Sequence, residues 1–259
     1  MIRLKSACEL EAMERAGRVV AEVLAMIRVR LKPGVTTGAL DREAEELIRS
    51  HPGATPAFKG LYGFPATLCT SVNEEVVHGI PSIRRPVREG DVLSVDVGVK
   101  LDGFFADAAM TFPVGEVSPE ARRLLTVTRR ALEEGIAQVR SGNRIGDVGS
   151  AIQRVAESAG FSVIRELVGH GVGEAVHEDP QVPNYGRSGH GVPLREGLVI
   201  AIEPMINAGG REILTLKDDW TVVTADGSLS AHFEHTVAVT VEGPRILTLA
   251  HAETPVGER

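Results

Sequence analysis

An internal repeat constrains the fold of this chain more than any other feature of its sequence. KPGVTTGALD (32–41) resembles RSGNRIGDVG (140–149), with two glycines aligned at an offset of 108 residues. EGDVLSVD (89–96) resembles EGLVIAIE (196–203) at an offset of 107, so that Glu, Gly, Val and a final acid coincide. Self-similarity of separate elements at a nearly constant offset indicates a duplicated structural unit.

The repeat predicts a single domain spanning residues 1–259, built from two related halves at about 1–117 and 118–250. A looser match pairs DAAMTFPVG from Asp107 with EHTVAVTVEG from Glu234 at an offset of 127, so the second half has about twenty more residues between its two acids. Each half is expected to contain two helices and an antiparallel sheet, with one acid on a strand and another on the next strand. The predicted fold class is therefore α/β, of the α+β kind.

Hydrophobic patterning and breaker residues set the expected elements. Ser6 is a plausible N-cap of the first helix, with Glu9 completing a capping box. The predicted helices are 6–30, 37–50, 118–140 and 145–159. The predicted strands are 66–72, 92–100, 104–113, 162–168, 198–206, 212–216, 220–225 and 232–241. The final residues, ETPVGER (253–259), are expected to be frayed.

Composition excludes several classes of protein. The net charge of -7, from 35 acidic against 28 basic residues, gives no support for a DNA or anionic-membrane partner. Two cysteines, Cys8 and Cys69, exclude a disulfide framework and a cysteine-based zinc site. No apolar run approaches the roughly 18 residues of a membrane span, and the N-terminus lacks the apolar core of a signal peptide. A cytoplasmic protein is expected.

Two acids lie inside apolar runs of the stretch VLSVDVGVKLDGFFADAAMTF (92–112). Asp-Gly at 102–103 is a strong signal for a two-residue hairpin turn. With that turn Gly98 faces Asp107, which puts Asp96 and Asp107 on one face as diagonal neighbours, about 7–8 Å apart at the backbone. Gly98 is expected to leave open space opposite Asp107. Like charges this close repel unless a cation lies between them.

The repeat supplies two more acids in matching places, Glu203 and Glu234. Four converging carboxylates would carry about four negative charges, which two divalent cations would neutralise. Taken singly, each acid is more often an exposed or salt-bridged strand residue than a ligand. The doubled placement is what favours a two-metal site, with two divalent ions per chain.

Three histidines, two of them next to glycines, could add a nitrogen ligand or contact a substrate. His170 and His177 occur in VGHGVGEAVHEDP, and His78 occurs in VVHGIP. The glycines that flank His170 suit a close approach of the backbone to an ion or ligand. Each histidine alone could equally be a hydrogen-bonded core residue. An imidazole among carboxylates suits Mn, Fe, Co or Zn.

These residues together resemble the metal ligands of the methionine aminopeptidases. Asp96, Asp107, His170, Glu203 and Glu234 have the order, types and settings of that family's five ligands. VHGIP, GHGVG, IEP and FEHTV resemble its signature segments, and the likeness extends over about residues 3–249. The compact length resembles the bacterial type I form. The resemblance implies the pita-bread fold, whose two halves are related by a pseudo-twofold axis.

The resemblance also implies a function and residue roles. It implies removal of the initiator methionine from nascent polypeptide N-termini at the ribosome by a monomeric enzyme, when the second residue is small. Asp96 would hold one divalent ion, His170 and Glu203 the other, and Asp107 and Glu234 would bridge both; the ions could be Co, Mn, Fe, Zn or Ni. Glu203 would shuttle a proton. His78 and His177 would contact the substrate, with His177 stabilising the tetrahedral intermediate.

The methionine pocket of that family maps onto a further set of apolar positions. They are Phe58, Leu61, Phe64, Cys69, Val176 and Trp220. Phe58, Leu61, Phe64 and Val176 depart from the family's commoner residues, cysteine, tyrosine, tyrosine and phenylalanine respectively, yet all remain apolar. Phe64 and Trp220 could also be plain core aromatics. Asn73, Glu75 and Ser230 match the surroundings of a monovalent-cation site in some members.

Three other readings stay open at this point. A peptidase of the same fold could act on Xaa-Pro bonds, although such enzymes normally carry an additional N-terminal domain. A non-catalytic pita-bread module could bind partners, although such proteins typically lose ligand residues. A glycosidase could use Asp96 and Asp107 as its two carboxylates, but that explains neither His170 nor the second pair of acids.

Overall fold

The structure is a computed structural model that describes residues 2–249, so the segment 253–259 predicted to be frayed lies outside the described residues. Within the described chain the helices are α1 (Ala7–Arg30), α2 (Thr37–Ser50), α3 (Pro119–Ala137) and α4 (Ile145–Ser158). The four predicted helices are confirmed. The capping box is also confirmed, because the Ser6 hydroxyl accepts from the Glu9 amide while the Glu9 carboxylate accepts from the Ser6 amide.

Over residues 2–249 the strands pair in antiparallel fashion in four sheets. The sheet orders are β1-β4-β2 with β5 paired to β4, β15-β14-β9-β7-β8, β13-β10-β6 and β11-β12-β3. Their bounds are β1 Thr55–Pro56, β2 Leu68–Val72, β3 Glu75–Val77, β4 Val92–Leu101, β5 Phe104–Pro113, β6 Ser162–Val163, β7 Gly169–Gly171, β8 Glu178–Val182, β9 Val199–Ile202, β10 Met205–Asn207, β11 Ile213–Thr215, β12 Val222–Thr224, β13 Ser230–His232, β14 His235–Thr240 and β15 Gly243–Ile246. A short 3-10 turn covers Leu61–Gly63.

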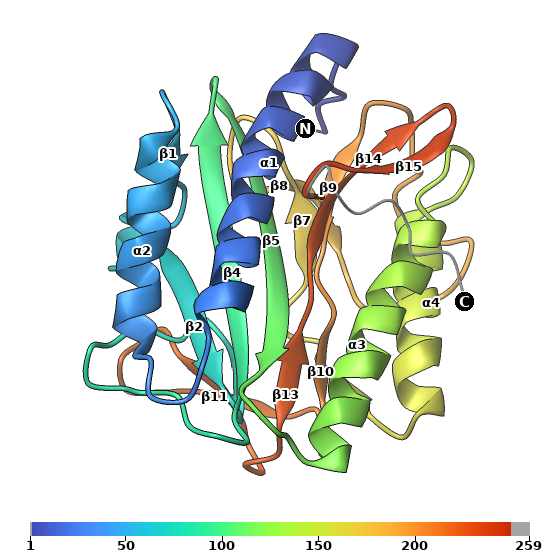
Figure 1. Cartoon of the computed structure of the whole chain (residues 1–259). Coiled ribbons are helices and arrows are strands. Elements are labelled where there is room, and N and C mark those ends of the chain that lie inside the picture. The colour runs from blue at the N-terminus through green and yellow to red at the C-terminus, as the bar shows by residue number, and fades with distance from the viewer. Residues whose placement is uncertain (1, 250–259) are drawn as a thin grey trace, which may run out of the picture.

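The two halves use their helices in the same way. Figure 1 shows α1 lying across the β4–β5 hairpin with α2 beside it, while α3 and α4 lie side by side over the second half. Each helix pair buries its apolar face in its own core, one built with β4 and β5 and the other with β9 and β14. The predicted α/β fold with antiparallel sheets is therefore confirmed, whereas the exact domain limits stay a prediction. In the part of the chain described, no helix combines the length and apolarity needed to cross a membrane.

Three strand predictions were wrong in extent. The strand predicted at 198–206 is interrupted at Glu203 and Pro204, because proline has no N–H to continue the ladder. The strand predicted at 232–241 is likewise divided between β13 and β14, at Phe233 and Glu234. The strand predicted at 162–168 is only β6, which pairs at two positions with β10. The first two interruptions both fall at acids of the predicted site.

The twenty or so extra residues of the second half have a structural role. They form β11 and β12, and β12 pairs with β3 of the first half. The connection between them carries Trp220 to the region of the predicted site. The insertion thus ties the two halves together beside that region.

Candidate metal centre

The β4–β5 hairpin has the predicted register. Leu101 pairs with Phe104, Gly98 with Asp107 and Asp96 with Ala109. Asp96 and Asp107 are therefore diagonal neighbours on one face, and both line the same cavity of about 260 Å³. The Asp-Gly turn determined this register, with Asp102 (φ 53°) and Gly103 (φ 85°) in the left-handed region that such a turn requires.

The expected open space at Gly98 is not there. A Cβ on Gly98 would lie 2.7 Å from Cε1 of Phe58 and 2.9 Å from Cβ of Ala57. Because the glycine has no side chain, the Phe58 ring can pack against the hairpin beside the two acids. The expectation was wrong because the Phe58 ring, which forms part of the cavity wall, fills the space beside Gly98.

Glu203 and Glu234 lie just outside their strands, so the prediction that each acid of the second half lies on a strand was wrong. Ile202 and His235 are the paired residues, which places the two acids where β9 and β14 diverge. The Glu234 amide donates to the carbonyl of Ala109, the residue opposite Asp96, at 2.8 Å. This bond brings the second pair of acids against the first.

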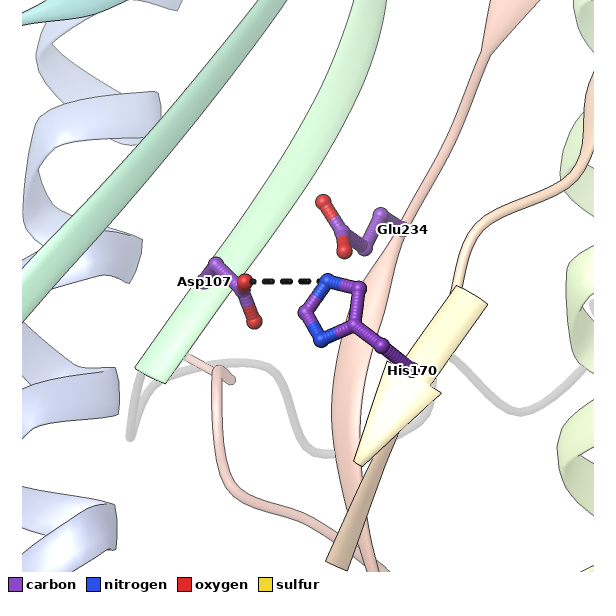
Figure 2. Close-up of side chains that lie close together, drawn as sticks. All are labelled: Asp107, His170 and Glu234. Atoms are coloured by element: carbon purple, nitrogen blue, oxygen red, sulfur yellow. Dashed lines mark ion pairs between the residues drawn. The ribbon is translucent and has the colours of Figure 1, made fainter. Parts of the chain in front are cut away.

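His170 completes the cluster from β7. Its Nε2 lies 3.6 Å from Oδ2 of Asp107 and 3.5 Å from Oε1 of Glu203. One potential ligand atom from each of Asp107, His170 and Glu234 lies within 4.8 Å of the others. Figure 2 shows these three side chains converging, with Asp107 on β5, His170 on β7 and Glu234 just before β14. His170 Nδ1 is 3.0 Å from the carbonyl oxygen of Gly171, which can only accept, so in the neutral ring Nε2 has a free lone pair.

The glycines around His170 serve strand packing. A Cβ on Gly169 would lie 2.3 Å from the carbonyl oxygen of Ala201, and one on Gly171 would lie 2.2 Å from that of Asp179. The close backbone approach predicted here therefore exists, but toward the neighbouring strands β9 and β8. That packing holds His170 against the acids.

All four acids are held in a low-dielectric environment. Burial raises the pKa of Asp107 above its usual range, and it raises the pKa of Asp96 well above it, with a further contribution from the Asp107 charge. Burial and the charges of the neighbouring acids likewise raise the pKa values of Glu203 and Glu234. Asp107 and Glu234 are 2% and 3% exposed. Such a cluster is costly when ionised unless cations compensate it.

Hydrogen bonds fix some of these groups and leave others open. The Thr236 hydroxyl donates to Oδ1 of Asp107 at 2.8 Å. The side-chain amide of Asn184 donates to the backbone carbonyl of Glu203 at 2.9 Å. Oδ1 of Asp96 is buried without a hydrogen-bond partner among residues 2–249. Carboxylate and imidazole ligand atoms that converge in this way, one of them unpaired, fit divalent metal ions.

His232 is a site residue that sequence reasoning missed. It is 2% exposed, and its Nε2 lies 3.9 Å from Oε2 of Glu203. Within the described part of the chain this nitrogen has no hydrogen-bond partner. Burial lowers its pKa to about 3, helped by nearby His78, so the ring is neutral. Its position two residues before Glu234 was the available signal.

His78 and His177 lie at the same cavity as the acids. His78 has φ 60°, a left-handed conformation that is uncommon for a non-glycine residue and recurs at functional sites as well as in turns. The rings of His170 and His177 pack edge to face with centroids 4.5 Å apart. Burial and the nearby His170 and His78 lower the pKa of His177 to about 4.

The predicted apolar pocket is assembled next to the acids. The predicted residues that line the cavity are Phe58, Leu61, Phe64, Cys69 and Trp220. Phe64 and Trp220 contact each other edge to face at 5.1 Å, so they pack as core aromatics and line the cavity as well. Val176 is buried in the same apolar cluster but is not one of the lining residues.

Tyr62 also lines the cavity and was not predicted. Its ring stacks on His177 with centroids 5.9 Å apart, and its φ of 51° is left-handed. The residue lies in the turn between two predicted pocket residues, Leu61 and Phe64, which was the only signal for it. It adds a polar hydroxyl to an otherwise apolar wall.

The predicted monovalent-cation residues lie together, but their side chains are engaged elsewhere. Asn73 bonds to Asp91 and to the Val92 amide. Glu75 bonds to Arg85, and Ser230 bonds to Asn207. A monovalent cation at Asn73, Glu75 and Ser230 stays a prediction.

The chain shares its fold and much of its sequence with characterised peptidases. Residues 11–241 match metallopeptidase family M24. The chain is 52% identical to the methionine aminopeptidase of Clostridium perfringens, over 96% of this chain and 99% of that protein. A crystal structure of methionine aminopeptidase from Thermotoga maritima matches with a TM-score of 0.94 and 47% identity, over 96% of this chain and 100% of that one. The prolidase of Pyrococcus horikoshii shares the fold alone, with a TM-score of 0.78 at 21% identity over 65% of its chain. The chain belongs to metallopeptidase family M24 and groups there with the methionine aminopeptidases.

Proposed function

We propose that the chain removes the initiator methionine from nascent polypeptides when the second residue is small. One observation carries the proposal: the four acids Asp96, Asp107, Glu203 and Glu234, together with His170 and an apolar wall, line a single cavity of about 260 Å³. The near full-length identity to methionine aminopeptidases supports the same activity. By the same likeness we propose that it acts as a monomer in the cytoplasm, on chains emerging from the ribosome.

Membership of a metallopeptidase family implies divalent metal use, and we propose two ions per chain. Asp96 would hold one ion, His170 and Glu203 the other, and Asp107 and Glu234 would bridge both. The ligand set of one nitrogen among oxygens suits Co, Mn, Fe, Zn or Ni. When bound, such ions polarise the peptide carbonyl and lower the pKa of water to near neutrality.

The chain's own residues bind and orient the substrate. The apolar wall, including Phe58, Phe64 and Trp220, would hold the methionine side chain and exclude water from it. His78 and His177 face the cavity next to the acids, where neutral imidazoles can hydrogen-bond to the peptide and to the oxyanion that forms during attack. Glu203, whose buried carboxyl has a raised pKa, would carry the proton to the leaving amine.

A substrate panel tests this function against the Xaa-Pro alternative. The metal-loaded protein is expected to cleave Met-Ala peptides at least about a hundredfold faster than Xaa-Pro peptides. A first side chain that fits the methionine pocket poorly costs roughly 1–3 kcal/mol, and the different shape of the Xaa-Pro peptide bond adds to this cost. Product analysis by mass spectrometry measures both rates. Preference for Xaa-Pro peptides would refute the proposal.

The remaining alternatives give different results in the same assay. A non-catalytic binding module would cleave neither peptide when loaded with metal. A two-carboxylate glycosidase would keep its activity after complete chelation, whereas the proposed enzyme loses peptide cleavage. The involvement of His170, Glu203 and Glu234 in one cluster with the two aspartates favours the metallopeptidase.

A further inference from the structure

Lys5 is a buried lysine that pairs with Glu178, the residue after His177, and has no place in the proposed reaction. Its side chain is 1% exposed, and Nζ lies 2.7 Å from Oε2 of Glu178. Nζ also donates to the carbonyl of Arg3 at 3.2 Å. Lysine is rarely this buried unless its charge is paired, so the ion pair with Glu178 accounts for its burial.

Glu178 directly follows His177, and its side chain bonds back to the turn 173–177. The second oxygen of Glu178, Oε1, accepts from the amides of Glu174 at 2.7 Å and Ala175 at 3.2 Å. One carboxylate therefore joins the turn 173–177 to Lys5. Arg3 adds an ion pair to Glu174 from the same N-terminal segment.

Gly173 shows that the turn is built around this ion pair. A Cβ on Gly173 would lie 2.7 Å from Nζ of Lys5 and 2.6 Å from Oε1 of Glu178, so a side chain there would have to displace the ion pair. The Gly173 carbonyl accepts from the Phe105 amide at 2.8 Å, which joins the turn to β5, the strand of Asp107. The Lys5 amide in turn donates to the Gly197 carbonyl at 2.7 Å.

We infer that Lys5 is a positioning residue for His177: through Glu178 it holds the turn 173–177 so that the His177 ring stays against His170 at the cavity. The inference rests on the proposed function, in which His177 contacts the substrate. Lys5 touches neither substrate nor metal ligand in this scheme. It acts only through the position of the His177 imidazole.

A double-mutant cycle tests the inference in the metal-loaded full chain with a Met-Ala peptide. Lys5→Met keeps the side-chain length and removes the charge, and it is expected to lower kcat about tenfold with little change in KM, as small displacements of a catalytic group do. In a His177→Ala background, which itself loses about a hundredfold, Lys5→Met should cause no further loss. Arg15→Met, which breaks the exposed ion pair with Asp102, is the matched control and should leave kcat unchanged.

Two outcomes would overturn the inference. An equal loss from Lys5→Met in both backgrounds would mean that Lys5 acts on the whole fold, and an unchanged kcat in the otherwise wild-type protein would mean that it does not position His177. If Lys5→Met does not fold, Glu178→Gln takes its place in the cycle. That variant keeps an oxygen for the Glu174 and Ala175 amides and loses the charge that pairs with Lys5.

A second readout does not depend on the proposed activity. The His177 ring lies against His170 and Tyr62, so its NMR resonances carry ring-current shifts that report its position. Lys5→Met should move these resonances and Arg15→Met should not. A wild-type protein inactive on Met-peptides would refute the proposed function alone, while unmoved His177 resonances would refute the inference.

Discussion

Replacing Asp107 by asparagine is expected to abolish metal binding and turnover together, with kcat/KM falling by at least about a thousandfold, more than the loss of a single transition-state hydrogen bond. Oδ1 of Asp107 is held by Thr236, and Oδ2 lies 3.6 Å from Nε2 of His170. Asparagine keeps the volume of the side chain but loses the charge and one oxygen ligand. Metal content and peptide cleavage, measured on the same preparation, check the prediction.

Asp102→Asn provides the matched control for this substitution. It makes the same chemical change at the exposed tip of the same hairpin, where Asp102 pairs with Arg15. Exposed ion pairs contribute about 0–1 kcal/mol, so the variant should bind metal and cleave peptides like wild type. Full metal content and activity in Asp107→Asn would contradict the proposal that Asp107 bridges the two ions.

The free energy of unfolding of the metal-free protein is expected to fall as the pH rises from about 4 toward neutrality. A variant that lacks one of the four acids should show a smaller fall. The pKa values of Asp96, Asp107, Glu203 and Glu234 are raised in the folded protein. A raised carboxyl pKa means that the folded state binds the proton more tightly than the unfolded state. This contribution to stability is therefore complete below the unfolded pKa of about 4 and is lost as the pH rises through the folded values, at up to about 1.4 kcal/mol per pH unit for each group.

Asp96→Asn makes this dependence measurable. Near pH 8 the metal-free variant should be more stable than metal-free wild type by about 1–4 kcal/mol, because it removes a buried charge without a partner. The difference should shrink toward pH 5 and should reverse in excess metal, which stabilises wild type by about 3 kcal/mol per ion at a hundredfold excess over Kd. Denaturant unfolding at several pH values gives these quantities. A wild-type protein that stays the more stable one at every pH without metal would show that the acids do not repel.

Local patterns were sufficient to predict the helices and the first pair of acids. The capping residue Ser6 and the turn residues 102–103 act within a few residues of the elements that they define, so helix α1 and the hairpin register could be read directly. The repeat then pointed to Glu203 and Glu234 as partners of Asp96 and Asp107. Periodicity did not show that β9 and β14 diverge at these acids, because interruption of a strand depends on the neighbouring strands.

The parts that could not be predicted depend on contacts between distant segments. Phe58 fills the space at Gly98 because the loop before β2 folds back over the hairpin. Lys5 reaches Glu178 across 173 residues of sequence, and no pattern near either residue indicates it. His232 is a different case. Its spacing of two residues from Glu234 is visible in the sequence, but its contact with the acids depends on Glu203, which comes from a distant segment.

The number of divalent ions bound per chain tests most directly whether metal ions compensate the buried acids. Metal-free wild-type protein and its Asp107→Asn variant would be titrated with Mn or Co in a calorimeter, with elemental analysis after removal of free ion. Two ions per wild-type chain and none held by the variant is the predicted result. If the wild-type protein binds no ion, its acids are compensated in another way and the proposed metal centre is contradicted.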